Sequence, residues 1–274
     1  MKGASPSLER MGFGDGVVLA LDTSTPDLSV AVCGADLGEA VRITVGNRMG
    51  AAIAPAVNGL MSGAGLARRD LAAIAVGAGP GPYTSLRVGL MFARAAAWAL
   101  GIPVLAACSL DIVARGVTGG VAAEDRAQGS PFGVALDARR REVYWACYDA
   151  EGRRTAGPLV AAPAAIEAEA VRWYGPGMPS PTAEGGAVVT DRGGPDALVL
   201  AEWVRASEAR GHMPEASENL PEAPGKLPEA PSEDIRWPSS DDDGSGAAWI
   251  PQTLLPPLPL YLRRPDAKVP SWLT

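Results

Sequence analysis

The order of short apolar segments between residues 17 and 115 limits the possible folds more than any other feature of this sequence. Three β-like runs come first, separated by the turn residues Thr25-Pro26-Asp27 and Gly34-Ala35-Asp36. Helix-like and strand-like segments then alternate. We expect strands at 17–21, 28–33, 39–45, 72–76 and 104–107, and helices at 50–64, 85–100 and 110–115. Short connections make the first three strands antiparallel, and strands joined by a helix must pair in parallel. The pattern therefore predicts a mixed sheet flanked by helices.

This β-β-β-α-β-α-β order is the ribonuclease-H-like arrangement from which actin-like ATPases build each of two lobes. A second series begins with a hairpin of Phe132–Leu136 and Glu142–Tyr148. Helical patterns at Ala164–Tyr174 and Asp196–Ala209 then flank a short strand at Ala187–Thr190. The predicted fold class is α/β, with two ribonuclease-H-like lobes of the actin-like ATPase superfamily and a reduced second lobe. The expected divisions are a flexible leader at 1–16, a first lobe at 17–115, a second lobe at 116–205, an acidic insertion at 206–246 and a C-terminal segment at 247–274 that packs back on the lobes.

The net charge of -7 is concentrated in residues 206–246, which hold ten of the 31 acidic residues but only three of the 24 basic ones. This stretch also repeats Pro-Glu-Ala every seven residues from Pro214. A proline in each repeat would break a coiled-coil helix, so disorder is the better interpretation. The remaining chain is electrically balanced, which argues against a broad basic face for binding nucleic acid.

Metal and disulfide chemistry find little support in the sequence. Cys33, Cys108 and Cys147 lie in apolar segments without metal-ligand spacing, and His212 is the only histidine. No apolar run reaches the roughly 18 residues of a membrane helix, and the N-terminus lacks the apolar stretch of a signal peptide. We expect a cytoplasmic protein with reduced thiols and no metal site.

Two motifs at strand ends could contact a nucleotide or another anion. The candidate residues are Asp22, Thr23, Ser24, Gly79, Gly81 and Thr84. Asp22 and its hydroxyl neighbours could hold a metal-bound phosphate, or they could close a hairpin as an Asx turn. The Gly77–Pro82 loop leads into a helix that Thr84 or Ser85 would cap, and such a helix start can bind an anion. It lacks the Walker lysine, so a rigid strand-to-helix turn stays the alternative.

Two other features could contact a macromolecular partner. The 85–100 helix is apolar nearly all round, so one side could pack on another helix, from this chain or from a partner subunit. The expected partner surface of helices 50–64 and 85–100 contains Ile53, Val57, Leu60, Met61, Leu86, Leu90 and Arg94. Arg139, Arg140 and Arg141 occupy the tip of the second-lobe hairpin. They form either a solvated tip or a contact to RNA or an acidic partner.

Several motifs together resemble the TsaB (YeaZ) family. They are LALDTSTPDLSVAV at 19–32, IAVGAGPGPYTSLRVGL at 74–90, GIPVLAACSLDIVA at 101–114, VALDARRREVYWACYD at 134–149 and PLYLR at 259–263. The family's loop usually reads GPGSFTGVR, whereas this chain has GPGPYTSLR at 79–87. Pro82 replaces the usual serine and removes its hydroxyl, and Ser85 replaces a glycine, so the backbone is stiffer. The acidic insertion has no counterpart in compact family members.

The resemblance implies an actin-like fold and a role in bacterial tRNA modification. Family members pair with a TsaD-type catalytic subunit as a heterodimer and work with a TsaE-type ATPase. The complex transfers a threonylcarbamoyl group from threonylcarbamoyl-adenylate to the adenosine beside the anticodon of tRNA. The helix that carries two metal-binding histidines in the catalytic relative has none here, at Asn47–Ile53. The resemblance thus implies a non-catalytic accessory subunit that reaches tRNA through the complex.

Alternatives from other classes stay open. An independent ATP-dependent kinase or ATPase would use Asp22, Thr23 and the Gly79–Thr84 loop around a magnesium nucleotide. A scaffold would pair the same helix surface with a second copy as a homodimer. A metallopeptidase would need ligands that this chain lacks. We expect no tightly bound cofactor, with ATP or ADP and magnesium as candidates only at the subunit interface of the complex.

Overall fold

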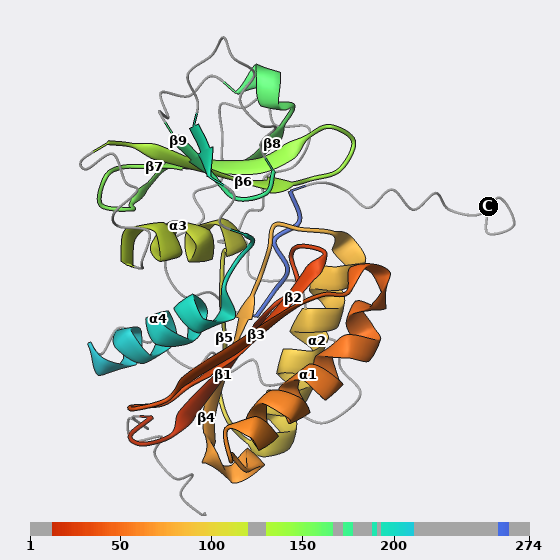
Figure 1. The fold of residues 1–274 in the computed structure, drawn as a ribbon, viewed down its shortest axis with the longest axis vertical. Helices are drawn as coiled ribbons and strands as arrows, with labels where there is room; N and C mark the ends of the chain where they lie inside the picture. Colours follow the sequence, from red (N-terminus) through yellow and green to blue (C-terminus); the bar gives the residue numbers. More distant parts are fainter. Residues whose placement is uncertain are drawn as a thin grey trace, which may run out of the picture.

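The first of two sheets is built from the N-terminal half of the chain. The structure is a computed structural model that describes residues 13–119, 130–166, 172–177, 188–190, 193–210 and 257–262. The first sheet has the order β3-β2-β1-β4-β5 (Figure 1). Its strands are β1 (Val17–Asp22), β2 (Asp27–Cys33), β3 (Gly38–Thr44), β4 (Leu71–Gly77) and β5 (Val104–Ala107). β1, β2 and β3 pair antiparallel, whereas β4 runs parallel to both β1 and β5. The predicted mixed sheet is confirmed.

Helices cover both faces of this sheet. α1 (Met49–Gly63) follows a single 3₁₀ turn (Gly46–Arg48) and packs beside α2 (Tyr83–Leu100) on one face. A second 3₁₀ turn, Arg68–Asp70, leads into β4. α2 begins at Tyr83 with Pro82 as its N-cap and no side-chain cap, so the expected capping by Thr84 or Ser85 is wrong. Gly101 ends α2 in the left-handed conformation that favours glycine, as its sequence predicts.

The other face of the first sheet is covered by α4 (Ala197–Ala209), which we had assigned to the second lobe. A core of small residues from β1, β2 and β4 receives the large side chains of α4, among them Leu200 and Trp203. Residues 197–205, expected in the second lobe, therefore belong to the first lobe in space, and residues 206–209, expected in the disordered insertion, are helical. The chain returns to the first sheet after building the second.

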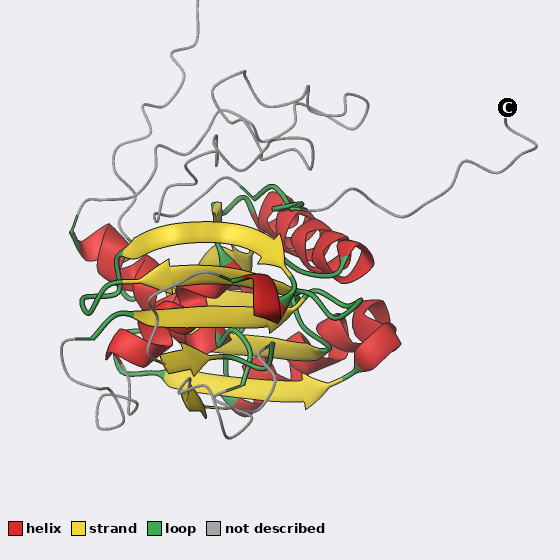
Figure 2. Cartoon of the chain, turned by 90° about the horizontal axis from the view of Figure 1, so that it is seen from above, coloured by secondary structure: helices red, strands yellow, loops and turns green. Residues whose placement is uncertain are grey.

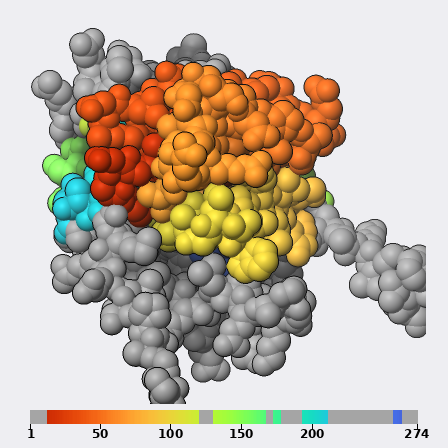
Figure 3. All heavy atoms as spheres, turned by 90° about the horizontal axis from the view of Figure 1, so that it is seen from below, coloured from red at the N-terminus to blue at the C-terminus, as the bar shows by residue number. Residues whose placement is uncertain are grey.

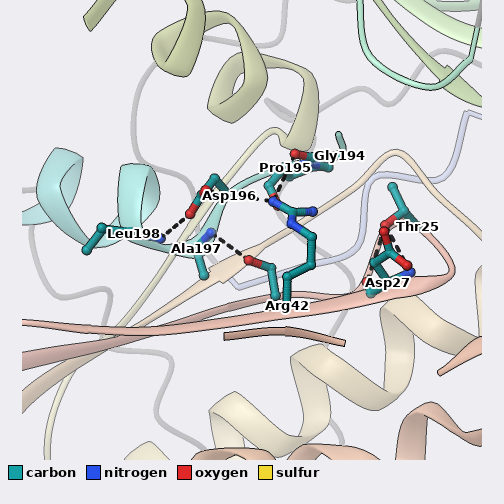
Figure 4. A network of polar contacts seen from close by, with 9 residues as sticks. Thr25, Asp27, Arg42, Gly194, Pro195, Asp196, Ala197 and Leu198 are labelled. Carbon is teal, nitrogen blue, oxygen red and sulfur yellow. Dashed lines mark hydrogen bonds and ion pairs between the residues drawn. The ribbon is translucent and has the colours of Figure 1, made fainter. Parts of the chain in front are cut away.

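Side chains on β2 and β3 hold the start of α4 in place (Figure 4). The Arg42 guanidinium donates to the backbone carbonyls of the two residues before Asp196, at 3.2 and 3.0 Å, and lies 3.8 Å from the Asp196 carboxylate. The buried Ser29 hydroxyl accepts a 2.9 Å hydrogen bond from the Ala197 N–H. Asp196 is itself the N-cap of the helix. These contacts join residues more than 150 positions apart in the chain.

The second sheet repeats the topology of the first. Its order, β10-β9-β6-β7-β8, mirrors β5-β4-β1-β2-β3, with the same parallel and antiparallel pairings. Figure 2 shows this sheet face-on, with helices behind it. The strands are β6 (Phe132–Asp137), β7 (Val143–Tyr148), β8 (Arg154–Ala161), β9 (Arg172–Tyr174) and β10 (Val188–Thr190). Asp22 and Asp137 therefore end equivalent strands.

Two parts of the second lobe differ from the sequence-based prediction. Residues 164–174 were expected to form a helix, but the structure has a 3₁₀ turn at Pro163–Ala165 and strand β9 at Arg172–Tyr174. β8 was not predicted, because Gly157 and Pro158 inside it weaken a strand pattern. At Gly157 a Cβ would approach the Trp145 carbonyl of β7 to 2.6 Å, so only glycine allows the two strands to pair this closely.

Helix α3 (Ser109–Gly119) connects the two lobes: it follows β5 of the first sheet and packs on the second sheet and against α4 (Figure 1). The largest hydrophobic core contains residues of both sheets, of α1, α2 and α3 and of the C-terminal residues 257–262. The three cysteines are free thiols and all are buried, in agreement with their apolar sequence context.

Parts of three predicted segments fall outside the described residues: 1–12 of the leader (1–16), 211–246 of the acidic insertion (206–246) with His212, and 247–256 and 263–274 of the C-terminal segment. Within the leader range the structure does describe Phe13, which is buried and whose N–H donates to the Glu208 carboxylate at 3.0 Å. The start of the described chain is thus anchored on α4. No helix among the described residues has the length and apolarity needed to cross a bilayer.

Candidate functional site

The end of β1 carries a carboxylate whose two oxygens both accept hydrogen bonds from groups of the same chain. Asp22 is 1% exposed. One of its oxygens accepts from the Ser24 N–H at 2.7 Å and the Ser24 hydroxyl at 2.6 Å, and the other accepts from the Ser109 hydroxyl at 2.7 Å. Burial raises the pKa of Asp22, and these donors partly offset that effect. The geometry is that of an Asx turn locked to the start of α3.

The Gly77–Pro82 loop folds directly onto this turn. The Ser109 hydroxyl also accepts from the Gly79 N–H at 3.1 Å. A Cβ on Gly77 would collide with the Asp22 carboxylate, and one on Gly81 would lie 2.6 Å from the Ser24 carbonyl oxygen. The glycines therefore serve close packing of the loop on the β1–β2 turn.

The six candidate anion contacts thus fall into two groups. Asp22, Thr23, Ser24, Gly79 and Gly81 come together as expected, but their polar groups bond to one another and to neighbouring backbone; the Thr23 hydroxyl, for example, donates to the Ser85 carbonyl at 2.9 Å. Thr84 lies exposed on α2, outside this cluster. These contacts support the alternative interpretation, in which the two motifs form a rigid turn.

The corresponding hairpin of the second lobe ends in an exposed basic tip. Arg139, Arg140 and Arg141 have φ angles of 64°, 56° and 65°, a left-handed run that is rare for residues with a Cβ. Asp137 holds its first residue, accepting from the Arg139 N–H at 2.8 Å and lying 3.4 Å from its guanidinium. The turn therefore holds three exposed arginines on a backbone whose conformation is fixed at its first residue by Asp137.

Most of the residues predicted for a partner surface face inward instead. Ile53, Val57 and Met61 of α1 and Leu86 and Leu90 of α2 are all 6% exposed or less and belong to the core beneath the helices. Leu60 and Arg94 are half-buried. Side chains that fill the space between a helix and a sheet cannot contact a partner, so the prediction is corrected for the five buried residues.

The outward faces of α1 and α2 carry a different set of residues. Met91 is 60% exposed and Trp98 57%, and Tyr83 at the start of α2 is 37% exposed. The two helices also carry small exposed residues, Ala51 and Ala54 on α1 and Ala95 and Ala99 on α2. In Figure 3 atoms of the α1 region (orange) and the α2 region (yellow) lie side by side on the surface. We call these seven exposed residues the α1/α2 face. The sequence signal that could have found the α2 members of this face is the 3.6-residue helical period, which puts them on the side of α2 opposite to its core residues.

Sequence reasoning missed a buried ionic cluster between α3 and the second sheet. Asp111 is fully buried, accepts a 2.8 Å hydrogen bond from the Tyr148 hydroxyl and lies 3.3 Å from the Arg154 guanidinium. Burial raises the pKa of Asp111 to about 6, although Arg154 opposes this effect. It also raises the pKa of the neighbouring Cys108 to about 12. An acidic residue within the apolar run Leu110–Ala114 was the available signal.

Metal-ligating side chains do not gather in the part of the chain that the structure describes, where no three His, Cys, Asp or Glu residues lie together as a metal site would require. The candidate functional features are therefore the α1/α2 face and the arginine tip.

Two sheets of identical mixed topology, joined by α3 and flanked by helices, define an α/β protein of the actin-like ATPase superfamily. The family model described as TsaD, tRNA N6-adenosine threonylcarbamoyltransferase, matches residues 47–184. The solved structure of YeaZ from Pseudomonas aeruginosa is 31% identical, covers 76% of this chain and 99% of its own, and superposes with a TM-score of 0.59. This chain belongs to the TsaB (YeaZ) family.

Curated relatives agree with this assignment. The TsaB protein of Bacillus subtilis, named for tRNA threonylcarbamoyladenosine biosynthesis, is 36% identical over 48% of this chain and 54% of its own. An uncharacterised protein of Mycobacterium tuberculosis is 43% identical over 55% of this chain and 67% of its own. The similarity to these curated relatives thus covers about half of this chain.

Proposed function

We propose that this chain is an accessory subunit in tRNA N6-threonylcarbamoyladenosine biosynthesis, and that it binds and activates a TsaD-type transferase subunit in the cytoplasm together with a TsaE-type ATPase. Family membership supports the pathway. The observation that carries the accessory role is the α1/α2 face, where Met91 and Trp98 are more than half exposed in the isolated chain.

The composition of this face suits a protein partner. Large exposed apolar side chains are the usual anchors of an interface, and small residues around them let a second helix approach closely. Trp98 and Met91 provide the anchors, and Ala95 lies between them on the same helix. A TsaD-type heterodimer would bury this surface. A homodimer through the same face is the competing arrangement when the partner is absent.

We further propose that Arg139, Arg140 and Arg141 contact tRNA phosphates once the complex has formed. Their exposure and the defined backbone of the tip support this role, since arginine forms strong, charge-assisted contacts with phosphate. The small number of charges fits a subunit that adds to tRNA binding by the complex without supplying most of it.

Nucleotide binding is proposed for the complex, at its subunit interface with magnesium, in preference to this chain alone. The Asp22 carboxylate is buried and already accepts three hydrogen bonds, so a magnesium phosphate would have to displace the Ser24 and Ser109 hydroxyls. This cost disfavours an independent kinase or ATPase built on Asp22.

Reconstitution tests the proposal. Purified TsaD-type and TsaE-type subunits, threonylcarbamoyl-adenylate and tRNA are combined with the wild-type chain, with Trp98→Glu or with Thr155→Glu, a matched control at an exposed position on β8 of the second sheet. We expect modification to require the chain, and Trp98→Glu to lose both co-elution with the TsaD-type subunit and most activity. Equal modification without the chain would overturn the accessory role. Co-elution unchanged by Trp98→Glu would overturn the assigned face.

A further inference from the structure

The C-terminal residues Pro257–Leu262 lie between the two lobes (blue in Figure 1), far along the chain from both sheets that they approach. The Leu260 N–H donates a 2.8 Å hydrogen bond to the carbonyl oxygen of Ala78, in the loop after β4. Leu260 is completely buried and Leu262 is 7% exposed. Alternate side chains therefore point into the protein, as in an extended strand.

Both lobes contribute to the apolar environment of this segment. Leu260 and Leu262 belong to the core that also contains Ala78 of the first lobe and Leu136 and Ala138 of the second. Ala138 immediately precedes the arginine tip. The segment thus belongs to the core that the two lobes share, and it bonds directly to the Gly77–Pro82 loop.

The side chain between the two leucines contacts α2. The ring of Tyr261 stacks on Tyr83, with ring centroids 4.7 Å apart and an interplanar angle of 30°. Arg87 lies over the other ring of this pair, 4.9 Å from the Tyr83 centroid, and donates to the Tyr83 hydroxyl at 2.7 Å. Burial raises the pKa of Tyr261 to about 12. The segment thus also fixes the first turn of α2.

We propose that the surface formed by the Gly77–Pro82 loop and the first turn of α2 is a binding site for an extended, apolar, proline-containing peptide, and that residues 257–262 occupy it in cis as a strap. The backbone bond to Ala78 would set the register, and the leucine and tyrosine side chains would give specificity. Prolines 257 and 259 favour the extended form before binding, which lowers the ordering cost. The strap and its site belong to one chain, so they meet at a higher effective concentration than two separate molecules would.

The strap is tested on the full chain, without any partner subunit, so the outcome is independent of the proposed function. A specific protease sequence replaces residues 238–246, and the folded protein is cleaved. We expect the C-terminal fragment to stay bound and to co-elute with the rest of the chain at about 10 micromolar, which requires an affinity of the site for the peptide itself. A synthetic peptide of residues 255–264 in excess should displace it. Leu260→Asp should release the fragment, whereas the volume-conserving control Leu260→Met should retain it.

Amide hydrogen exchange of the uncleaved protein tests the strap independently, also where the cleaved chain cannot be recovered. Leu260→Asp should raise amide hydrogen exchange at least tenfold both in residues 77–82 and in the first turn of α2, residues 83–87, whereas Leu260→Met should leave both unchanged. Separation of the unsubstituted fragment at 10 micromolar, or exchange that is the same in Leu260→Asp and the unsubstituted chain, would overturn the strap.

Discussion

The carboxylate of Asp22 and the hydroxyl of Ser109 lie 2.7 Å apart and join the end of β1 to the start of α3, across 87 positions of the chain. The same hydroxyl accepts from the Gly79 N–H, so one serine connects the β1–β2 turn, the Gly77–Pro82 loop and the helix that leads to the second lobe. A motif that resembles a phosphate-binding turn thus forms a structural joint in this chain.

Gly77→Ala should destabilise the protein by about 2–4 kcal/mol, because the added Cβ would collide with the Asp22 carboxylate and disturb a buried hydrogen-bonded charge. Urea denaturation measures the free energy of unfolding. Gly59→Ala on α1 is the matched control: nothing lies within 4 Å of its Cβ position, so the change should stabilise the helix by about 0.5–1 kcal/mol. Equal effects of the two substitutions on the free energy of unfolding would show that Gly77 is not needed for the close packing of the loop on Asp22.

Leu90→Ala should cost about 2–5 kcal/mol of folding free energy, because Leu90 is 3% exposed and its removal leaves a cavity. Its neighbour Met91 is 60% exposed, and Met91→Ala should change stability by no more than about 0.5 kcal/mol. Chemical denaturation of the pair checks which side of α2 faces the core. A large loss for Met91→Ala would mean that the isolated chain buries this side of the helix as well.

Stability should depend on pH through Asp111. Its folded-state pKa is raised by burial to about 6, so its contribution to stability is complete below about pH 4 and is lost as the pH rises through 6. Relative to Asp111→Asn, the free energy of unfolding of the wild type should fall by on the order of 3 kcal/mol between pH 4 and pH 7. Urea titrations of both proteins at several pH values test this. Parallel pH profiles would show that Asp111 has an ordinary pKa.

Arg140→Asn should weaken the proposed tRNA contact without lowering the stability of the fold. Asparagine tolerates a φ of 56° better than arginine, so the melting temperature should stay equal or rise. In the reconstituted complex the affinity for tRNA should fall several-fold, and its salt dependence should become less steep. Arg153→Asn is the control on the same lobe, since Arg153 is an exposed arginine outside the tip. An equal loss in both variants would point to a general charge effect, against a defined contact.

Much of the first lobe could be predicted because its signals are local. Turn residues separate β1, β2 and β3, and Gly101 with Pro103 stops α2, so the strands were placed to within about two residues of their observed bounds. The second lobe was harder. β8 contains Gly157 and Pro158, which usually argue against a strand, and only the close approach of β7 explains them.

The candidate site shows a similar division. The sequence brought Asp22, Ser24 and Gly79 into one cluster correctly, but it could not show that Ser109 supplies the remaining hydrogen bond. It identified α1 and α2 as important helices but selected their inner sides. Apolar residues mark both a core and an interface, and α2 is apolar nearly all round, so composition alone does not separate the two.

The sequence by itself determined the order of the elements in the first lobe, the mixed sheet expected from that order, and the family to which the chain belongs; the second lobe was expected to be reduced, but its sheet has the full five strands. These features depend on hydrophobic period, turn chemistry and motifs that are continuous in the chain. Only the tertiary structure decided that α4 returns to the first sheet, that the Asp22 carboxylate accepts its hydrogen bonds from within the chain, and that Leu260 packs on the loop after β4. Each of these depends on residues that are far apart in the chain and meet only when the packed core has brought them together, and no local pattern encodes that meeting.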